Sequence, residues 1–319
     1  MKITASWVAC FAGLSAVALS GTVLSAVALA ASAPQPAPPP AAQSQSQPQS
    51  QAQSQAAPPA QSVAARPIRV YIHAGLKTHA EGQHDYPQFL ADWSKLLTNR
   101  GAIVDGGLHF PSAHELAGVD VLVIYKGDAG YLSEEDRLTL DTYLRRGGGL
   151  VSLHDALCGP DPEYFGKILG GAKKHGEVNY TLEADVAYKI AAPSHPIMQG
   201  MTELTIKDEA FFLITWAKSP EINVLANAPI AATKSAGTHS GEVVPQIWTY
   251  ERALFPGPAS EPYRAFVWMQ GHNYANFANP QIQTMLLRGI AWAGKRPADA
   301  LMTERPRPAP RTQPATRPQ

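Results

Sequence analysis

The chain has 319 residues with 26 basic and 26 acidic side chains, so its formal net charge is zero at neutral pH. Proteins that bind nucleic acid through charge carry an excess of Lys and Arg, and this balance argues against nucleic acid as a partner. Cys10 lies in the apolar start of the chain and Cys158 is the only other cysteine, which excludes a disulfide within the remaining sequence.

Residues 1–30 have the pattern of a secretory signal peptide. Lys2 supplies a minimal basic start, an apolar run follows, and Ala28-Leu29-Ala30 is a small-x-small cleavage site. The alternative is an uncleaved membrane anchor, because the run is long enough to span a bilayer. Its many small residues, with no basic cluster after it, favour cleavage. We therefore expect a periplasmic or secreted protein, which would be membrane-anchored if the signal peptide is not removed.

Two segments have compositions that cannot form a packed core. Residues 31–66 are almost entirely Ala, Pro, Gln and Ser, which predicts a disordered, semi-stiff linker. Residues 296–319 carry five Arg among many Pro, which predicts a disordered basic tail. The residues between them, 67–295, are numerous enough for one domain with a sizeable core.

The first half of this domain alternates short apolar runs with amphipathic segments. Strands are expected at residues 68–73, 102–105, 119–125 and 149–153. The run 119–125 is almost continuously apolar, as in a parallel sheet that is covered on both faces. Helices are expected at 86–100, which ends before Gly101, and from Ser133, a good N-cap, to Gly147. This order predicts an α/β fold with a doubly wound, flavodoxin-like sheet.

The second half has a different pattern. Short strand-like runs occur at residues 180–186, 204–206, 222–226, 244–250 and 264–269, and a last helix at 279–293. These runs are not separated by helices, so we expect them to extend the mostly parallel sheet with antiparallel strands. No heptad pattern is present, and the sequence predicts no oligomeric state.

Polar and titratable side chains stand where four predicted strands end. They are His73, Lys126 with Asp128, His154 with Asp155, and Gln270 with His272. Ligands of open parallel sheets bind beyond the carboxyl ends of the strands, so these groups are expected to converge at one edge. His154 is the leading candidate for acid/base catalysis, with Asp155 assisting. Lys126, Asp128 and Gln270 are candidate substrate-binding residues. A lone histidine at a strand end is more often structural, so the prediction depends on their convergence.

The loop after the first strand adds further histidines, His79 and His84. Imidazole and carboxylate are the ordinary ligands of zinc-like ions, so His73, His79, His84 and His272, with His154, could hold a divalent metal ion. The spacing is not diagnostic, because there is no His-Glu-x-x-His and no paired-Cys motif. The alternative is a set of histidines that only form hydrogen bonds along a polar cleft.

Two more candidates come from the second half. Asp208 and Glu209 form a carboxylate pair before two phenylalanines; Glu209 could act as acid or base and Asp208 could bind substrate, unless the pair caps a turn. Trp248 could offer a flat face to a sugar ring, although burial in the core is the commoner fate of a tryptophan.

Several short motifs resemble those of ThuA-like (trehalose utilisation) domains. They are Gly147-Gly148-Gly149 followed by His154, Ser194-His195-Pro196-Ile197 with Gly200, Asp208-Glu209, Gly271-His272, and the closing run 287–293. The loop 79–86 resembles a His-rich variant of the first loop of that family. The matches span residues 69–293, and their common order and spacing carry the resemblance, because each motif alone is short.

The resemblance implies a fold like the class I glutamine amidotransferase domain and a connection with trehalose and related sugars, through keto-sugar intermediates. Amidotransferases carry a cysteine nucleophile at the elbow after the Gly-rich strand. Here His154 and Asp155 occupy that elbow, and Cys158 is out of register. Cys-dependent glutaminase activity is therefore not expected.

Three functions fit these observations. The first is an enzyme that acts on a sugar or keto-sugar derivative by His/carboxylate acid–base chemistry, assisted by a metal if one is bound. The second is a non-catalytic module that binds carbohydrate or a component of the cell envelope. The third is a metal-binding protein without turnover. A small-molecule carbohydrate is the expected partner of the first two.

Overall fold

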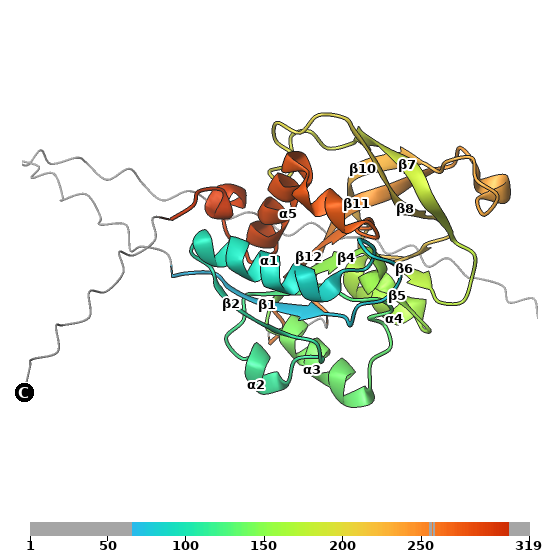
Figure 1. The fold of residues 1–319 in the computed structure, drawn as a ribbon. Helices are drawn as coiled ribbons and strands as arrows, with labels where there is room; N and C mark the ends of the chain where they lie inside the picture. Colours follow the sequence, from blue (N-terminus) through green and yellow to red (C-terminus); the bar gives the residue numbers. More distant parts are fainter. Residues whose placement is uncertain (1–65, 255–256, 258, 306–319) are drawn as a thin grey trace, which may run out of the picture. The chain divides into compact units, whose positions relative to one another are not determined.

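A mixed sheet of nine strands organises the protein, whose computed structural model describes residues 66–254, 257 and 259–305 (Figure 1). The predicted signal peptide and the predicted linker up to residue 65 lie outside the described residues, as do residues 306–319 of the predicted tail. Among the described residues, no helix is both long enough and apolar enough to cross a membrane.

The first part of the sheet is parallel. Its strands are β2 (Ile103–Gly107), β1 (Arg69–Ala74), β3 (Val121–Tyr125), β4 (Gly149–Leu153) and β12 (Tyr263–Trp268), in that order. All five residues of β3 are buried, as expected for a strand covered on both faces. The predicted flavodoxin-like, mostly parallel sheet is confirmed.

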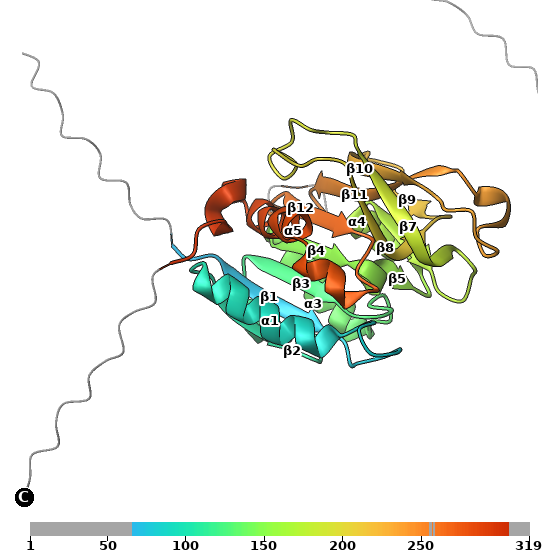
Figure 2. The same ribbon diagram turned by 45° about the horizontal axis from the view of Figure 1, so that its top comes forward.

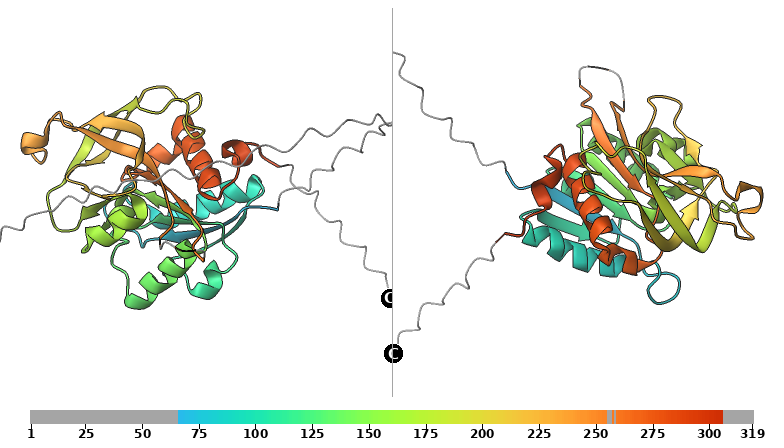
Figure 3. Two further views of the ribbon diagram at one scale, coloured as in Figure 1. Left: turned by 180° about the vertical axis from the view of Figure 1, so that it is seen from behind. Right: turned by 90° about the horizontal axis from the view of Figure 1, so that it is seen from above.

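Antiparallel strands continue the sheet beyond β12 (Figure 3). They are β11 (Val243–Arg252), β10 (Asn223–Pro229), β7 (Tyr180–Ile190) and β8 (Leu204–Phe211). The predicted antiparallel extension is thus present. A small second sheet of β5 (Cys158–Gly159), β6 (Gly171–Lys174) and β9 (Thr215–Trp216) was not predicted, because strands of two to four residues show no periodicity.

Helices cover both faces of the parallel part (Figures 1 and 2). On one face lie α1 (Tyr86–Asn99) and α5 (Pro280–Ala293), and on the other α3 (Glu134–Arg145) and the short α2 (Ala113–Leu116). Helix α4 (Pro162–Leu169) leads into β6, and single turns form η1 (His154–Leu157), η2 (Gly237–His239), η3 (Tyr274–Ala278) and η4 (Ala298–Leu301). Ser133 caps α3 as predicted, since its hydroxyl accepts from the amide of Asp136 at 3.1 Å.

The first ten residues of the predicted tail, 296–305, are among the described residues and lie against the domain. Leu301 in η4 is buried, and Asp299 forms a 2.7 Å ion pair with Arg288 of α5. Docking against α5 therefore orders a stretch whose composition alone predicts disorder.

The Gly-rich segment before β4 is explained by a close approach of two elements. A Cβ on Gly149 would lie 2.3 Å from the carbonyl oxygen of Ala293, at the end of α5, and 3.2 Å from that of Asp120. Both neighbours are backbone atoms, which cannot rotate away as a side chain can. Glycine is therefore required here for packing, because it has no Cβ.

Replacing Gly149 by alanine should lower the free energy of unfolding by about 1–3 kcal/mol, because α5 must move away from β4. Urea denaturation of the full-length protein measures this change. Gly118→Ala is the matched control, since its added carbon would meet only the Arg69 side chain, at 3.4 Å. Equal stability of the two variants would contradict the packing argument.

Candidate metal centre

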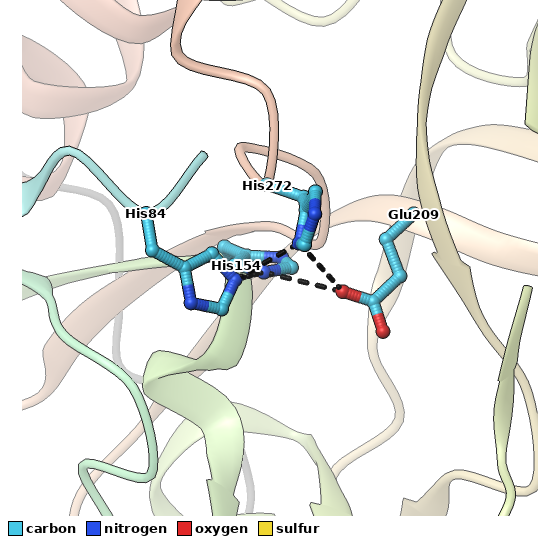
Figure 4. Close-up of side chains that lie close together, drawn as sticks. All are labelled: His84, His154, Glu209 and His272. Carbon is cyan, nitrogen blue, oxygen red and sulfur yellow. Dashed lines mark hydrogen bonds and ion pairs between the residues drawn. The ribbon is translucent and has the colours of Figure 1, made fainter. Parts of the chain in front are cut away.

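Four buried side chains meet beyond the carboxyl ends of the parallel strands: His84, His154, Glu209 and His272 (Figure 4). The Nε2 atoms of His84 and His154 are 2.9 Å apart, and Nδ1 of His272 is 3.0 Å from Nε2 of His84. Oε2 of Glu209 lies 3.4 Å from Nε2 of His154 and 3.3 Å from Nδ1 of His272. One donor atom from each residue thus lies within 4.8 Å of all the others.

The sheet topology produces this convergence. His154 directly follows β4, His272 follows β12 after a short turn, and His84 lies in the loop between β1 and α1. Parallel strands end at the same edge, so these histidines are brought together from distant parts of the sequence. Glu209 comes instead from β8, at the far side of the antiparallel extension.

Two buried side chains tie the Glu209 segment to the parallel strands. Nε2 of Gln270 donates to the carbonyl of Glu209 at 3.2 Å and to Oε1 of Gln246 at 2.6 Å. Oε1 of Gln270 accepts a hydrogen bond from the hydroxyl of Tyr188. Nε2 of Gln246 donates in turn to the carbonyl of Phe211 at 3.2 Å. Gln270, predicted to bind substrate, thus has both its amide atoms occupied within the protein.

The backbone at two of these residues is in the left-handed region. His84 has φ 48° and His154 has φ 55°, and Gly271, just before His272, has φ 128°. Non-glycine residues with such angles are uncommon and cost of order 1–3 kcal/mol each, so they persist only where the surrounding structure imposes them. At His154 the strained residue forms the elbow between β4 and η1, the position expected from the sequence.

The ring nitrogens converge on the centre of the cluster. Nδ1 of His154 lies 3.2 Å from the carbonyl oxygen of Met269, and since a carbonyl only accepts, Nδ1 carries a proton and the ring is held by this hydrogen bond. Nε2 of His84 faces two partners, at 2.9 and 3.0 Å. Imidazole nitrogens that meet in this way, with a carboxylate beside them, have a geometry that suits a cation at the centre.

Burial and the neighbouring His154 lower the pKa of His84 to about 2, so this ring is neutral at physiological pH. Burial also opposes the charged form of His272, but the hydrogen bond to Glu209 and the charges of Glu209, Asp208 and Glu183 together outweigh it and raise the pKa of His272. A neutral imidazole is the form that binds a metal ion. Nδ1 of His84 is also held, 3.0 Å from Oγ1 of Thr78, so the ring has an outer partner that orients it.

Asp208 holds the loop that carries His272. Its carboxylate is fully buried and accepts five hydrogen bonds, from the amides of Glu209, Gly271, His272 and Asn273 and from Nδ2 of Asn276, at 2.6–3.3 Å. Burial raises the pKa of Asp208, while His154 and these donors act in the opposite direction. The predicted substrate-binding residue thus has no oxygen directed to solvent and instead positions two of the four clustered residues.

A second charged pair adjoins the cluster. Oδ1 of Asp155 accepts from Nζ of Lys173 at 3.1 Å, and Oδ2 is 3.8 Å from Nε2 of His154. Burial alone would raise the pKa of Asp155, but His154 and Lys173 hold it well below its usual range. Nζ of Lys173 also lies 3.9 Å above the ring of Phe211. Asp155 is therefore a fixed carboxylate beside the cluster.

The cluster opens into a cavity of about 410 Å³ whose wall combines polar and apolar groups. Predicted residues on this wall include His79, Asp128, Asp155 and Glu209. The His79 ring lies above the cluster, 4.0 Å from the ring of His84 and 5.5 Å from that of His272 between centroids. It is exposed, so it lies at the mouth of the site and not at its centre.

Three other predicted site residues lie away from this cavity wall. His73 packs edge-on against Phe110 at 5.6 Å, and burial, with the charge of Lys126, lowers its pKa to about 4. Lys126 is half-buried and donates to the carbonyl of Gly127. Trp248 is fully buried, and its Nε1 donates to the carbonyl of Leu169 at 2.7 Å, so it offers no face to a ligand.

Sequence reasoning missed several titratable residues of the cavity wall, among them Lys173 and His175. Lys173 is 7% exposed. In the sequence it is one of two adjacent lysines, a pattern that is typical of a solvent-exposed surface. His175 follows at once, in a stretch without periodicity. No local signal separates these residues from ordinary loop residues, since strand β6 that positions them has only four residues.

Comparison with known proteins places this geometry in a family. A ThuA-like protein from Parabacteroides merdae has a similar structure, with a TM-score of 0.55 and 18% identity, covering 76% of this chain and 94% of the other. A ThuA-like protein from Bacteroides uniformis gives 0.53 and 19%, covering 74% and 95%. At these identities the likeness shows the fold alone. No curated protein matches the chain. The family model described as "ThuA: Trehalose utilisation" matches residues 78–293, more than half of the sequence, and the chain therefore belongs to the ThuA family.

Proposed function

We propose that this protein is a metal-dependent enzyme that acts on a sugar or keto-sugar derivative outside the cytoplasm. The observation that carries the proposal is the convergence of His84, His154, Glu209 and His272, with donor atoms within 4.8 Å of one another. Three imidazole nitrogens and one carboxylate oxygen form a ligand set typical of Zn²⁺ and related divalent ions.

The spacing of the donors fits a single ion. Ligands that lie about 2.1 Å from a metal are about 3.0–3.4 Å from each other for coordination angles between 90° and 109°. The four contacts between neighbouring donor atoms of the cluster span 2.9–3.4 Å. Little movement is therefore needed to bind a metal, which is consistent with a site held by Asp208 and by strained backbone at two ligands.

A bound ion would polarise a carbonyl or hydroxyl oxygen of the substrate. In this arrangement His154 and Glu209 serve as ligands, and Asp155 is left as the acid/base group. Its Oδ2 lies 3.8 Å from the ligand His154, and Lys173 fixes the other oxygen at 3.1 Å. Because Lys173 keeps Asp155 ionised, its carboxylate is in the form that can accept a proton from the substrate.

Sugar as the substrate class is supported by the description of the family and by the cavity itself. The cavity of about 410 Å³ has carboxylates, imidazoles and an ammonium group on its wall, which can pair with several hydroxyls. The signal-like residues 1–30 support a location outside the cytoplasm. Cys158 is buried, which raises the pKa of its thiol, so glutaminase-type attack by this residue is not part of the proposal.

The protein purified without chelator or affinity metal should contain about one equivalent of a divalent metal at the four-residue centre. His84→Ala removes one donor, and Glu209→Gln replaces a charged donor by a neutral amide oxygen. Each change should weaken metal affinity by at least about 10–100-fold, the loss already typical when a group that only orients a ligand is changed. Elemental analysis measures the content. His114→Ala, an exposed histidine of α2, is the control and should keep its metal. Equal metal content in all four proteins would contradict the assignment.

Asp208→Asn should weaken metal binding without removing a ligand. An amide in place of the carboxylate turns one acceptor into a donor that faces N–H groups, so the free energy of unfolding should fall by about 1–3 kcal/mol. Metal affinity should fall about 10–100-fold, because the His272 loop is released. Isothermal titration with Zn²⁺ and thermal unfolding measure both. Asp185→Asn, an exposed partner of Lys207 at 3.7 Å, is the matched control.

Asp155→Asn should retain its metal but lose about 10²–10⁴-fold in turnover, because the proton acceptor is gone while the four ligands remain. Mass spectrometry of trehalose and of mono-keto disaccharides incubated with the protein detects the products. Binding of a sugar by both proteins, with no product from either, would favour the non-catalytic carbohydrate-binding module instead.

A further inference from the structure

A second group of metal-binding side chains lies on the wall of the same cavity: Asp128, Cys158 and His175. One carboxylate oxygen, the thiol sulfur and one imidazole nitrogen lie within 4.8 Å of one another. Nδ1 of His175 is 2.8 Å from Oδ1 of Asp128. This group shares no residue with the four-residue centre, so it is a separate cluster in one cavity.

Backbone contacts fix the three donors relative to one another. Asp128 comes from the loop after β3, Cys158 from β5 and His175 from the end of β6. The amide of Gly130 donates to the carbonyl of Cys158 at 2.8 Å, and the amide of His175 donates to the carbonyl of Gly159 at 2.9 Å. The parallel pairing of β5 with β6 completes the link between these segments. The donors are therefore positioned by the fold before any ligand binds.

We propose that Asp128, Cys158 and His175 bind a thiophilic divalent cation such as Zn²⁺ or Co²⁺, distinct from the ion of the four-residue centre. A thiolate, an imidazole and a carboxylate together match the ligand preferences of these ions. Three protein ligands leave a coordination position free, and because all three residues line the cavity, that position is accessible to water or substrate.

The charges of the cluster suit a dication. Cys158 has an S–H bond that breaks when the sulfur–metal bond forms, and the proton passes to solvent; no group is oxidised or reduced. The thiolate and the Asp128 carboxylate then supply two negative charges to the ion. The 2.8 Å contact between Asp128 and His175 is an ordinary ion-pair distance, so the cation must replace that contact by inserting between the two groups.

Sulfur gives this site a signature that the four-residue centre cannot produce. The chain contains two cysteines, at positions 10 and 158, so in a Cys10→Ser protein any thiolate-to-cobalt charge-transfer absorption arises from Cys158. Metal-free Cys10→Ser protein titrated with Co²⁺ should bind two equivalents and develop this near-ultraviolet absorption. Adding Cys158→Ser should abolish the absorption and leave one equivalent bound.

His175→Ala in the Cys10→Ser protein tests the site through an exposed residue, whose removal should leave the fold intact. Its cobalt affinity, followed by the charge-transfer absorption, should fall at least about tenfold. His239→Ala is the matched control, because His239 also pairs with a carboxylate, Glu242 at 2.7 Å, but has no cysteine in its contacts. Its titration should be unchanged.

The outcomes separate the two metal sites. Saturation of the Cys10→Ser protein with Co²⁺ and no charge-transfer absorption would overturn the second site, whatever happens at the first. An unchanged cobalt affinity in His175→Ala would overturn it as well, even if Cys158→Ser proves unfolded by circular dichroism. His84→Ala in the same background should lose one equivalent of Co²⁺ and keep the charge-transfer absorption. If the Cys10→Ser protein itself develops the absorption but binds only one equivalent, the second site is retained and the proposed function is contradicted.

Discussion

The close approach of three imidazole rings and a carboxylate in one buried cluster is the constraint around which this structure is arranged. Three imidazole nitrogens and a carboxylate oxygen lie 2.9–3.4 Å from their neighbours. Burying such an arrangement is costly unless protons or a cation lie between the polar atoms. The protein nonetheless holds it, through left-handed backbone at His84 and His154 and a buried carboxylate with five donors. Rigidity imposed against local preference is typical of sites built for a ligand.

The antiparallel extension completes this centre. The parallel strands bring three histidines to one edge, but the only clustered carboxylate, Glu209, belongs to β8, the last strand in the sheet order. The hydrogen bonds of Gln270 and Gln246 connect the β8 segment to the end of β12, and Asp208, next to Glu209, holds the loop of His272. One strand thus supplies one residue of the cluster and positions another, so a change in its register would disturb both.

The sequence predicts the strands, the long helices and the convergence of His84, His154 and His272, because apolar runs and the rule for strand ends are local or topological signals. It does not predict the face on which each side chain lies. His73 also ends a parallel strand, yet it packs on Phe110, since side chains of a strand alternate between faces. Glu209 is a candidate from the sequence, but its place beside the histidines depends on pairing between distant strands, as does the place of Lys173. Such long-range contacts leave no trace in a window of ten residues. Trp248 shows the same limit, because burial of an aromatic side chain is decided by packing and not by its type.

The elbow at His154 explains how a fold like that of the glutamine amidotransferases can accommodate different chemistry. A sharp turn after a buried strand, with φ 55°, pushes one side chain into the cavity at the carboxyl edge. A cysteine there would need a base and would react covalently. A histidine at the same point presents a nitrogen to three further donors, and the following Asp155 is placed beside it, bound to Lys173. The turn that exposes a nucleophile is equally suited to aim a metal ligand, because both roles require one strained residue at the end of the central strand.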